Sequence, residues 1–513
     1  MASTPPEISR ASVGLRSERG PVLLSLMLAT ALVALDSTVI ATAIPTITKE
    51  LGGFSQFPWL LSVYLLAQAA TTPLYGKLAD VVGRKPVILF GVAVFLAGSI
   101  LCGFAWSMPA LIAFRAVQGL GAGAILPMST TIVGDIYTLA ERAKVQGYVA
   151  SVWGVSAVVG PLIGGAFSEW VSWRWIFWVN IPLCLVAGGI LLRNFREKVE
   201  RKKHRVDYLG AVLVTAATTL LMLGLLEGGE GWPWTSLTSA LVVGGGLVLA
   251  VAFVLVERRA PEPVLPLWVF GRRMLLTTSV VSLGVGAVMI GFTSYIPTFT
   301  QVTLGTGALV AGFSVATMTV GWPVAAAQSG RLYLRHGFRV TALLGAALAI
   351  VGVLLVLLFV GTGSTPWEIG AFCLVVGAGL GLAAPTTVIA AQHTVGWSER
   401  GVVTSANMFS RSIGSALGVA VYGAIVNASL GRTAAHPEPG PLADAVREVF
   451  LGVLVAGVLM LVAVLLMPRG GEGRQDRETA DGDVAFTDGK PDVTVGEQGV
   501  TVGEQDVTVG GDA

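Results

Sequence analysis

Charge is scarce in this chain of 513 residues: Asp, Glu, Lys and Arg make up 12% of it, whereas hydrophobic residues make up 54%. Soluble proteins carry about twice that share of charge. The low charge, a mean hydropathy of +0.75 and repeated apolar runs of about 20 residues exclude a string of soluble domains. The composition predicts an all-α protein that crosses a membrane many times.

Cysteine and histidine are also rare. The three cysteines, Cys102, Cys184 and Cys373, each fall inside an apolar run, which predicts buried thiols and neither a disulfide framework nor a metal site. The four histidines are scattered over loops and helix ends, and no G-x-x-x-x-G-K-[ST] phosphate loop occurs. We therefore expect no metal, no cofactor, no nucleic-acid partner and no enzymatic activity.

The sequence instead contains fourteen apolar segments, separated by glycine, proline or charge. With the N-terminus inside, 27 of the 33 Lys and Arg residues fall in inner segments and four in outer loops. This asymmetry predicts a multi-pass protein of the cytoplasmic (cell) membrane with both termini in the cytoplasm. The first segment is full length and lacks a cleavage site of small residues, so no cleaved signal peptide is expected. Helices are predicted near residues 21–43, 57–75, 87–106, 109–133, 147–167, 175–192, 208–226, 238–256, 274–296, 308–328, 340–361, 367–391, 402–427 and 449–468.

Two pairs of patterns indicate an internal repeat. GLGAGAILP (119–127) and GAGLGLAAP (377–385) share G-x-G-x-G-x-x-x-P, and GKLADVVGR (76–84) has a degraded partner in GRLYLRHGF (330–338). Unless the matches are a coincidence in a glycine-rich chain, they predict two six-helix bundles around a central site, with two helices inserted between them. The predicted parts are a cytoplasmic N-terminal segment (1–20), an N-terminal bundle (21–192), cytoplasmic linkers with the inserted helices (193–273), a C-terminal bundle (274–468) and a disordered acidic cytoplasmic tail (469–513).

One acidic residue lies deep within a predicted helix: Asp36, in LDSTVIATAIP (35–45). Arg115 lies in LIAFRAVQGLGAGAILP (111–127), and at 1.5 Å per residue the two reach nearly the same depth in the bilayer. We predict that they pair and that Asp36 carries a proton, because a guanidinium does not titrate. A static pair is the alternative. Arg411 is predicted near the cytoplasmic side, where it can reach the interface, and Asp135 is interpreted as interfacial.

Two glycine-containing stretches predict conformational elements. In GKLADVVGRKPVIL (76–89), a predicted cytoplasmic loop, Gly76 and Gly83 permit tight turns, and Asp80 can bond Arg84 or cap a neighbouring helix. This predicts a breakable latch between the bundles, although the basic residues there also serve topology. VVGPLIGGAF (158–167) predicts a bent, closely packed helix that acts as a gate, with simple packing as the alternative. The gate residues are Gly160, Pro161, Gly164 and Gly165.

These stretches resemble the motifs of the major facilitator superfamily, specifically its fourteen-span drug:proton antiporters (EmrB/QacA-like). GKLADVVGRK, LDSTVIATAIP, RAVQG (115–119) and GPLIGG (160–165) carry the resemblance, which covers residues 20 to about 468, and Ala41 replaces the usual asparagine of the first-helix motif. The resemblance implies that Asp36 is the proton carrier and Arg115 its modulator. It also implies that Asp80 and Arg84 control the change between inward and outward states.

The predicted function is proton-coupled efflux of amphipathic, cationic or antibiotic-like molecules by alternating access. A proton-coupled symporter or a uniporter for a small metabolite on the same fold is the alternative. The partners expected are a small amphipathic substrate, protons and membrane lipids, and the protein is expected to be a monomer. Residues predicted to line a cavity between the bundles are Tyr64, Gln118, Met128, Tyr295, Phe299, Gln301, Met318, Trp322, Asn407 and Met408.

Overall fold

The structure is a computed structural model, and nearly all of the chain that it describes is helical. The described residues are 13–52, 56, 58–197, 207–228, 232–260, 263–430, 439–469, 492–496 and 499–503. The predicted N-terminal segment, the basic loop after residue 193 and the acidic tail therefore lie partly outside the described residues.

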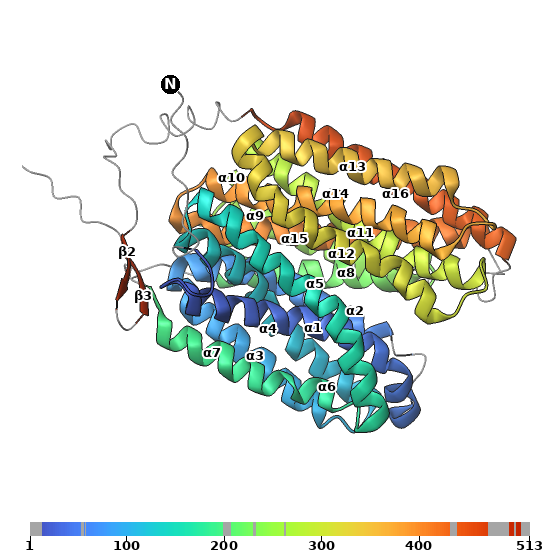
Figure 1. Ribbon diagram of the computed structural model, residues 1–513, viewed down its shortest axis with the longest axis horizontal. Helices are drawn as coiled ribbons and strands as arrows, with labels where there is room; N and C mark the ends of the chain where they lie inside the picture. The colour runs from blue at the N-terminus through green and yellow to red at the C-terminus, as the bar shows by residue number, and fades with distance from the viewer. Residues whose placement is uncertain are drawn as a thin grey trace, which may run out of the picture.

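Two helical bundles lie side by side, with their helices roughly along the long axis of the molecule (Figure 1). The first contains α1 (Gly20–Leu51), α2 (Pro58–Val82), α3 (Arg84–Gly103), α4 (Met108–Ile136), α5 (Leu139–Trp170), the short α6 (Trp175–Trp178) and α7 (Asn180–Asn194). The second contains α11 (Arg273–Val302), α12 (Ala308–His336), α13 (Phe338–Phe359), α14 (Pro366–His393), α15 (Arg400–Leu430) and α16 (Pro439–Leu466). Between them in the chain lie α8 (Tyr208–Glu227), α9 (Leu237–Glu257) and the short α10 (Trp268–Gly271), and a 3₁₀ turn (Trp397–Glu399) precedes α15.

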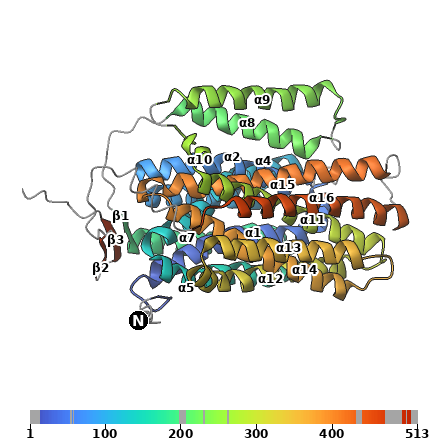
Figure 2. The same cartoon turned by 90° about the horizontal axis from the view of Figure 1, so that it is seen from above.

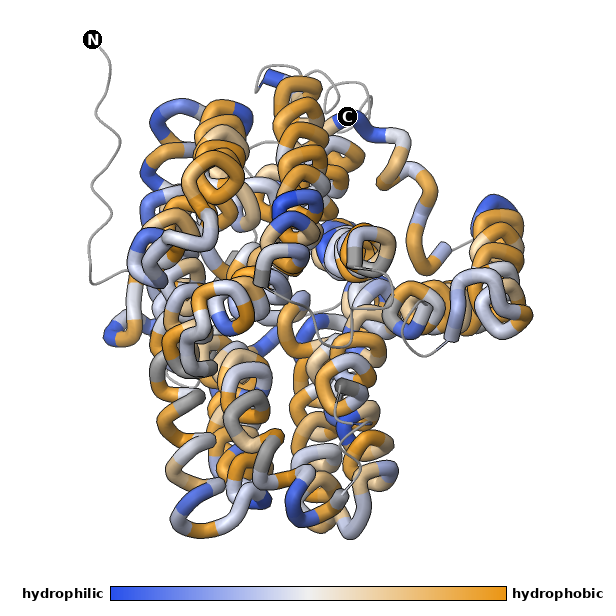
Figure 3. Tube along the Cα trace, turned by 90° about the vertical axis from the view of Figure 1, so that its right-hand side faces the viewer, coloured by the Kyte–Doolittle hydropathy of each residue, from blue (hydrophilic) through white to orange (hydrophobic). Residues whose placement is uncertain are grey.

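All fourteen predicted segments are helical, but the fourteen-span arrangement is not confirmed. Twelve of the described helices are long and apolar enough to cross a membrane. The two predicted segments outside this set are α2, which carries Gln68, Thr71 and Thr72 in its middle, and α8, whose described apolar part is the shorter Leu209–Leu225. Hydrophobic residues predominate along the helices of both bundles, with fewer hydrophilic residues among them (Figure 3).

The glycine repeat predicted from the sequence reappears as the same packing in both bundles. In α4, a Cβ atom at Gly121 would meet the backbone of Phe95 in α3; in α14, a Cβ atom at Gly379 would meet the backbone of Ala349 in α13. Glycine is therefore needed for these close approaches. The glycines two residues to either side face the other neighbour, which is α2 for residues 119 and 123 and α12 for residues 377 and 381.

The inserted helices α8 and α9 pack against each other and lie along one side of both bundles (Figure 2). Met222 of α8 packs in one cluster with Ala69 of α2 and Ala416 of α15. Because α2 belongs to the first bundle and α15 to the second, α8 covers a seam between them.

The tail differs from the prediction of disorder in two short stretches. Asp492–Gly496 (β2) and Gly499–Gly503 (β3) pair in an antiparallel hairpin, and β3 also pairs in parallel with Phe195–Glu197 (β1). Alternating β-branched Val and Thr residues favour a strand, and this preference competes with the glycine and charge that predicted disorder. The rest of the tail lies outside the described residues.

Candidate functional site

Asp36 and Arg115 form a buried ion pair within the first bundle. Asp36 lies in the middle of α1, Arg115 lies two turns into α4, and both side chains are 0% exposed. Arg115 Nη1 donates to Asp36 Oδ2 at 2.6 Å. The pairing that the depth argument predicts is therefore present.

Gln118 forms hydrogen bonds with both members of this ion pair. Its Nε2 donates to Asp36 Oδ1 at 2.9 Å and to Ser99 Oγ at 2.8 Å, while its Oε1 accepts from Arg115 Nη1 at 2.7 Å. The Arg115 guanidinium also lies 4.2 Å from the centre of the Tyr64 ring. Gln118 and Tyr64, predicted from sequence to line the substrate cavity, are buried against the ion pair in this conformation.

The arrangement shields a titratable carboxyl group from solvent. Asp36 accepts one charge-assisted hydrogen bond from Arg115 and one neutral hydrogen bond from Gln118, so both of its carboxylate oxygens are engaged.

Helix α5 packs against α1 close to the ion pair. A Cβ atom at Gly160 would meet the Thr38 side chain, and Thr38 Oγ1 donates to the carbonyl oxygen of Ser156 at 3.1 Å. Of the other predicted gate residues, Gly164 is buried and Gly165 is partly exposed, whereas the Pro161 side chain lies outside the described residues. The close-packed face of the glycine motif is thus directed at the helix that carries Asp36.

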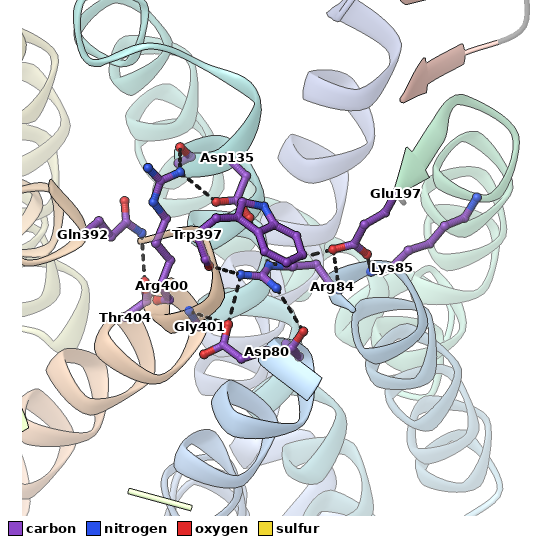
Figure 4. Close-up of polar contacts among 12 residues, drawn as sticks. Asp80, Arg84, Lys85, Asp135, Glu197, Gln392, Trp397, Arg400, Gly401 and Thr404 are labelled. Carbon is purple, nitrogen blue, oxygen red and sulfur yellow. Dashed lines mark hydrogen bonds and ion pairs between the residues drawn. The ribbon is translucent and has the colours of Figure 1, made fainter. Parts of the chain in front are cut away.

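Asp80 joins the two bundles. Its carboxylate accepts from the backbone N–H groups of Gly401 at 3.0 Å and Val402 at 2.8 Å, in the first turn of α15. It also lies 3.0 Å from Arg84 Nη2. Both contacts predicted for Asp80 are present, and the carboxylate sits at the positive end of the α15 dipole (Figure 4). We call Asp80, Arg84 and the first turn of α15 the latch, and the end of the molecule where they lie the latch end.

The latch does not lie on a long loop. The sequence predicts a loop between residues 75 and 87, but α2 continues to Val82 and α3 begins at Arg84, so that Gly83 alone separates them. Gly83 has a φ of 99°, which favours glycine. A Cβ atom at Gly76 would meet Ser405 of α15, so this glycine allows α2 and α15 to touch beside the latch.

Arg84 has partners that the sequence did not indicate. Its Nε donates to Asp135 Oδ2 at 3.0 Å, and its guanidinium lies 3.6 Å from the centre of a Trp397 ring (Figure 4). Glu197 accepts from the backbone N–H groups of Arg84 and Lys85, each at 3.0 Å. Asp135, interpreted from sequence as interfacial, is instead 7% exposed. Charged residues at helix ends ordinarily serve topology, so spacing gave no signal for these contacts.

Further contacts close the latch end between the bundles. Arg400 Nη1 donates to Asp135 Oδ1 at 3.0 Å and to the carbonyl oxygen of Gly134 at 3.0 Å. Gln392 of α14 donates to Thr404 Oγ1 at 2.8 Å and accepts from Arg142 of α5 at 3.4 Å. Polar groups of both bundles thus bond to one another at this end of the molecule.

The chain matches the sequence profile of the Major Facilitator Superfamily over residues 26–419. The chain belongs to this superfamily. This major facilitator is a membrane transporter and not an enzyme. The profile does not identify the fourteen-span branch to which the motifs are similar.

Its relatives include named drug and efflux transporters. The chain is 34% identical over 407 residues to Multidrug resistance protein 3 of Bacillus subtilis (strain 168), covering 79% of each chain. It is 32% identical over 418 residues to Multidrug transporter protein MdtP of the same organism, covering 82% of this chain and 77% of that one. Efflux pump FUS6 of Gibberella moniliformis (strain M3125 / FGSC 7600) is 34% identical over 423 residues, with 80% and 75% covered.

A solved structure shares the fold. The crystal structure of the human organic anion transporter MFSD10 (TETRAN) superposes with a TM-score of 0.61 at 15% identity, and the match covers 91% of this chain and 100% of that one. At this identity the similarity concerns the fold alone.

The remaining predicted cavity residues of this major facilitator divide into two groups. Met128, Phe299 and Met318 are packed in hydrophobic cores, and Asn407 bonds to Ser282 and Thr278. These four do not line open space in this conformation. The sequence could not separate them from cavity residues, because a helix that is apolar nearly all round gives no signal for the face that points inward. Gln301 is exposed, and Tyr295, Trp322 and Met408 are partly exposed.

The latch of this major facilitator is expected to respond to pH. Asp80 lies beyond the predicted membrane-spanning part of α2. Burial raises its pKa from the ordinary 3.8 to about 7, against the opposing effects of Arg84 and the two backbone N–H groups. Opening returns the carboxyl to water and to its ordinary pKa, so the closed latch binds the proton more tightly. Protonation therefore favours the closed latch in acid, and this contribution is lost as the pH rises through about 7.

Spin labels at positions 144 and 331, which are exposed on α5 and α12, measure this opening. We expect the short-distance population to fall as the pH rises from about 4 to about 7, between the open and closed pKa values of Asp80. Asp80→Asn is expected to remove this dependence. An equal pH dependence in Asp80→Asn would assign it to another group.

Proposed function

We propose that this transporter exports small amphipathic drugs or antibiotics from the cell in exchange for protons, by alternating access. The names of the relatives support drug efflux. The observation that carries the proton coupling is the buried ion pair of Asp36 and Arg115, joined by Gln118. An ionisable residue inside the membrane is costly, and it is usually kept for function.

The proposed cycle couples the ion pair to the latch. With the latch closed, the central region faces outward; Asp36 takes up a proton from outside and substrate leaves. Opening of the latch then exposes the centre to the cytoplasm, where Asp36 releases its proton as substrate binds. Movement reaches Asp36 through α5, which packs on α1 at Thr38. If proton and substrate favour opposite charge states of one carboxylate, exchange follows without ATP.

The proposal includes the membrane arrangement. The protein would span the cell membrane fourteen times as a monomer, with both termini in the cytoplasm, in contact with lipid on the outer faces of both bundles. The proton gradient would be its energy source, with no cofactor.

An efflux assay in a pump-deficient bacterial host tests the proposal. Cells that express the protein are loaded with members of a chemically varied drug panel, and cellular drug is followed before and after a protonophore collapses the gradient. We expect low steady-state drug that rises when the gradient collapses. A symporter would give the opposite result, because uptake would fall on collapse, and no response to the protonophore would contradict proton coupling.

A further inference from the structure

Helix α15 carries a guanidinium at mid-membrane depth. Arg411 lies eleven residues after Arg400, which is about 16 Å along the helix in a bilayer core of about 30 Å. This position is too deep for the interfacial role predicted from sequence. Among the residues that the structure describes, no acidic group lies within ion-pair distance of Arg411 and no acceptor takes a hydrogen bond from its side chain.

The neighbours of the residues around the α15 helix axis show which way the Arg411 side chain faces. Gly414 packs against Leu283 of α11, and Ala416 packs in the cluster with α2 and α8. Leu417 is 38% exposed and lies about 120° around the helix from Arg411. The sector between α11 and α2, on the side away from Leu417, holds Arg411 and Met408, and both are partly exposed. Arg411 therefore borders the space between the two bundles.

The charge in the membrane interior is unbalanced. Deep within the predicted spans the charged residues are Asp36, Arg115 and Arg411, and the first two neutralise each other. Arg411 thus leaves one net positive charge at this depth, where an unpaired charge costs several kcal/mol.

The hydroxyl groups near Arg411 are already used by backbone acceptors. Ser412 Oγ donates to the carbonyl oxygen of Met408 at 3.3 Å, and Ser415 Oγ donates to that of Gly286 at 3.2 Å. Within the described part of α15, Arg411 therefore supplies the unused donors on this sector of the helix.

We propose that Arg411 binds the carboxylate of an amphipathic organic anion in the space between the bundles. A guanidinium presents a planar pair of donors that matches a carboxylate. Met408, one turn away on the same sector, offers an apolar surface to the rest of such a molecule. The inference rests on the proposed function, because it places the substrate in that space. The substrate proposed here is an anion, whereas the sequence predicted amphipathic, cationic or antibiotic-like molecules.

Equilibrium binding to the purified full chain in detergent tests this proposal. The probes are dansyl-labelled undecanoic acid and its primary amide, which differ only in the carboxylate, and probe fluorescence gives the dissociation constants. We expect the wild-type chain to bind the acid at least about tenfold more tightly than the amide. In Arg411→Gln the two affinities are expected to become equal through loss of acid binding alone, and Arg411→Lys is expected to retain part of the preference.

The amide serves as the folding control, because its affinity is expected to stay unchanged in Arg411→Gln. Arg335→Gln removes the same charge from an exposed position at the end of α12 and is expected to keep the preference. Equal affinities in the wild-type chain, no binding of either probe, or a preference that survives in Arg411→Gln would overturn the proposal. No gradient is present, so a failure of proton-driven export would leave this result standing, and the reverse also holds.

Discussion

Replacing Asp36 with asparagine is expected to abolish proton-driven export, down to the rate of vesicles without the protein. Asparagine has nearly the shape of aspartate, and its single amide oxygen can still accept from one of the two side chains that bond Asp36, Arg115 or Gln118. It cannot take up or release a proton in this range of pH, so the step that couples the gradient to substrate disappears. Drug efflux from proteoliposomes with an imposed pH gradient measures this loss.

The matched control for Asp36→Asn is exchange without a gradient. Counterflow of labelled for unlabelled substrate needs alternating access but no net proton movement, and it is expected to persist in Asp36→Asn. Asp36→Glu, which keeps a titratable carboxyl group, is expected to retain gradient-driven export in part. Full export by Asp36→Asn would remove the proton-carrier role and leave the pair a structural one.

Replacing Arg84 with alanine is expected to open the latch end. The guanidinium contacts Asp80, Asp135 and the Trp397 ring, and its side chain is 0% exposed. Removing one partner of a buried ion pair typically costs about 3–5 kcal/mol, because the other charge stays buried and unpaired. The closed state loses this stabilisation, while the open state lets water reach both carboxylates. We expect the distance between spin labels at positions 144 and 331 to lengthen in most molecules, and transport to slow at least tenfold.

An exposed ion pair at the same end provides the control for Arg84→Ala. Arg272 Nη1 lies 3.6 Å from Glu399 Oε2, and both side chains are well exposed. Surface pairs contribute about 0–1 kcal/mol, so Arg272→Ala is expected to leave the label distances unchanged. Equal opening in both variants would show that the latch end responds to any lost charge and that Arg84 has no special part.

The ion pair and the latch were accessible to sequence reasoning for a specific physical reason. Charge inside hydrocarbon is costly, so Asp36 and Arg115 stand out in apolar runs, and the helical rise gives their depth. Asp80 stands out because the rule that basic residues collect on the cytoplasmic side explains the Lys and Arg residues of its motif but not an acidic residue among them. The repeat glycines were found because only glycine permits such close helix contacts.

Other parts of the site left no such signal. Gln118 and Met128 both lie in α4, whose residues are apolar or small on nearly every side. Without an amphipathic pattern, the sequence does not show which face of this helix points to the ion pair, to the core or to the cavity. Asp135 and Glu197 look like ordinary charged residues at helix ends until tertiary contacts bring Arg84 to them. The span count depends on α2 and α8, whose hydropathy and length are marginal.

Proton release on substrate binding tests the central claim most directly. The purified chain is placed in weakly buffered detergent solution with a pH indicator, and a drug that it exports is added. If Asp36 holds the proton that substrate displaces, the wild-type chain will acidify the solution as drug binds, and Asp36→Asn will bind the drug without acidifying it. Equal acidification by both chains, or none by the wild type, would contradict the account.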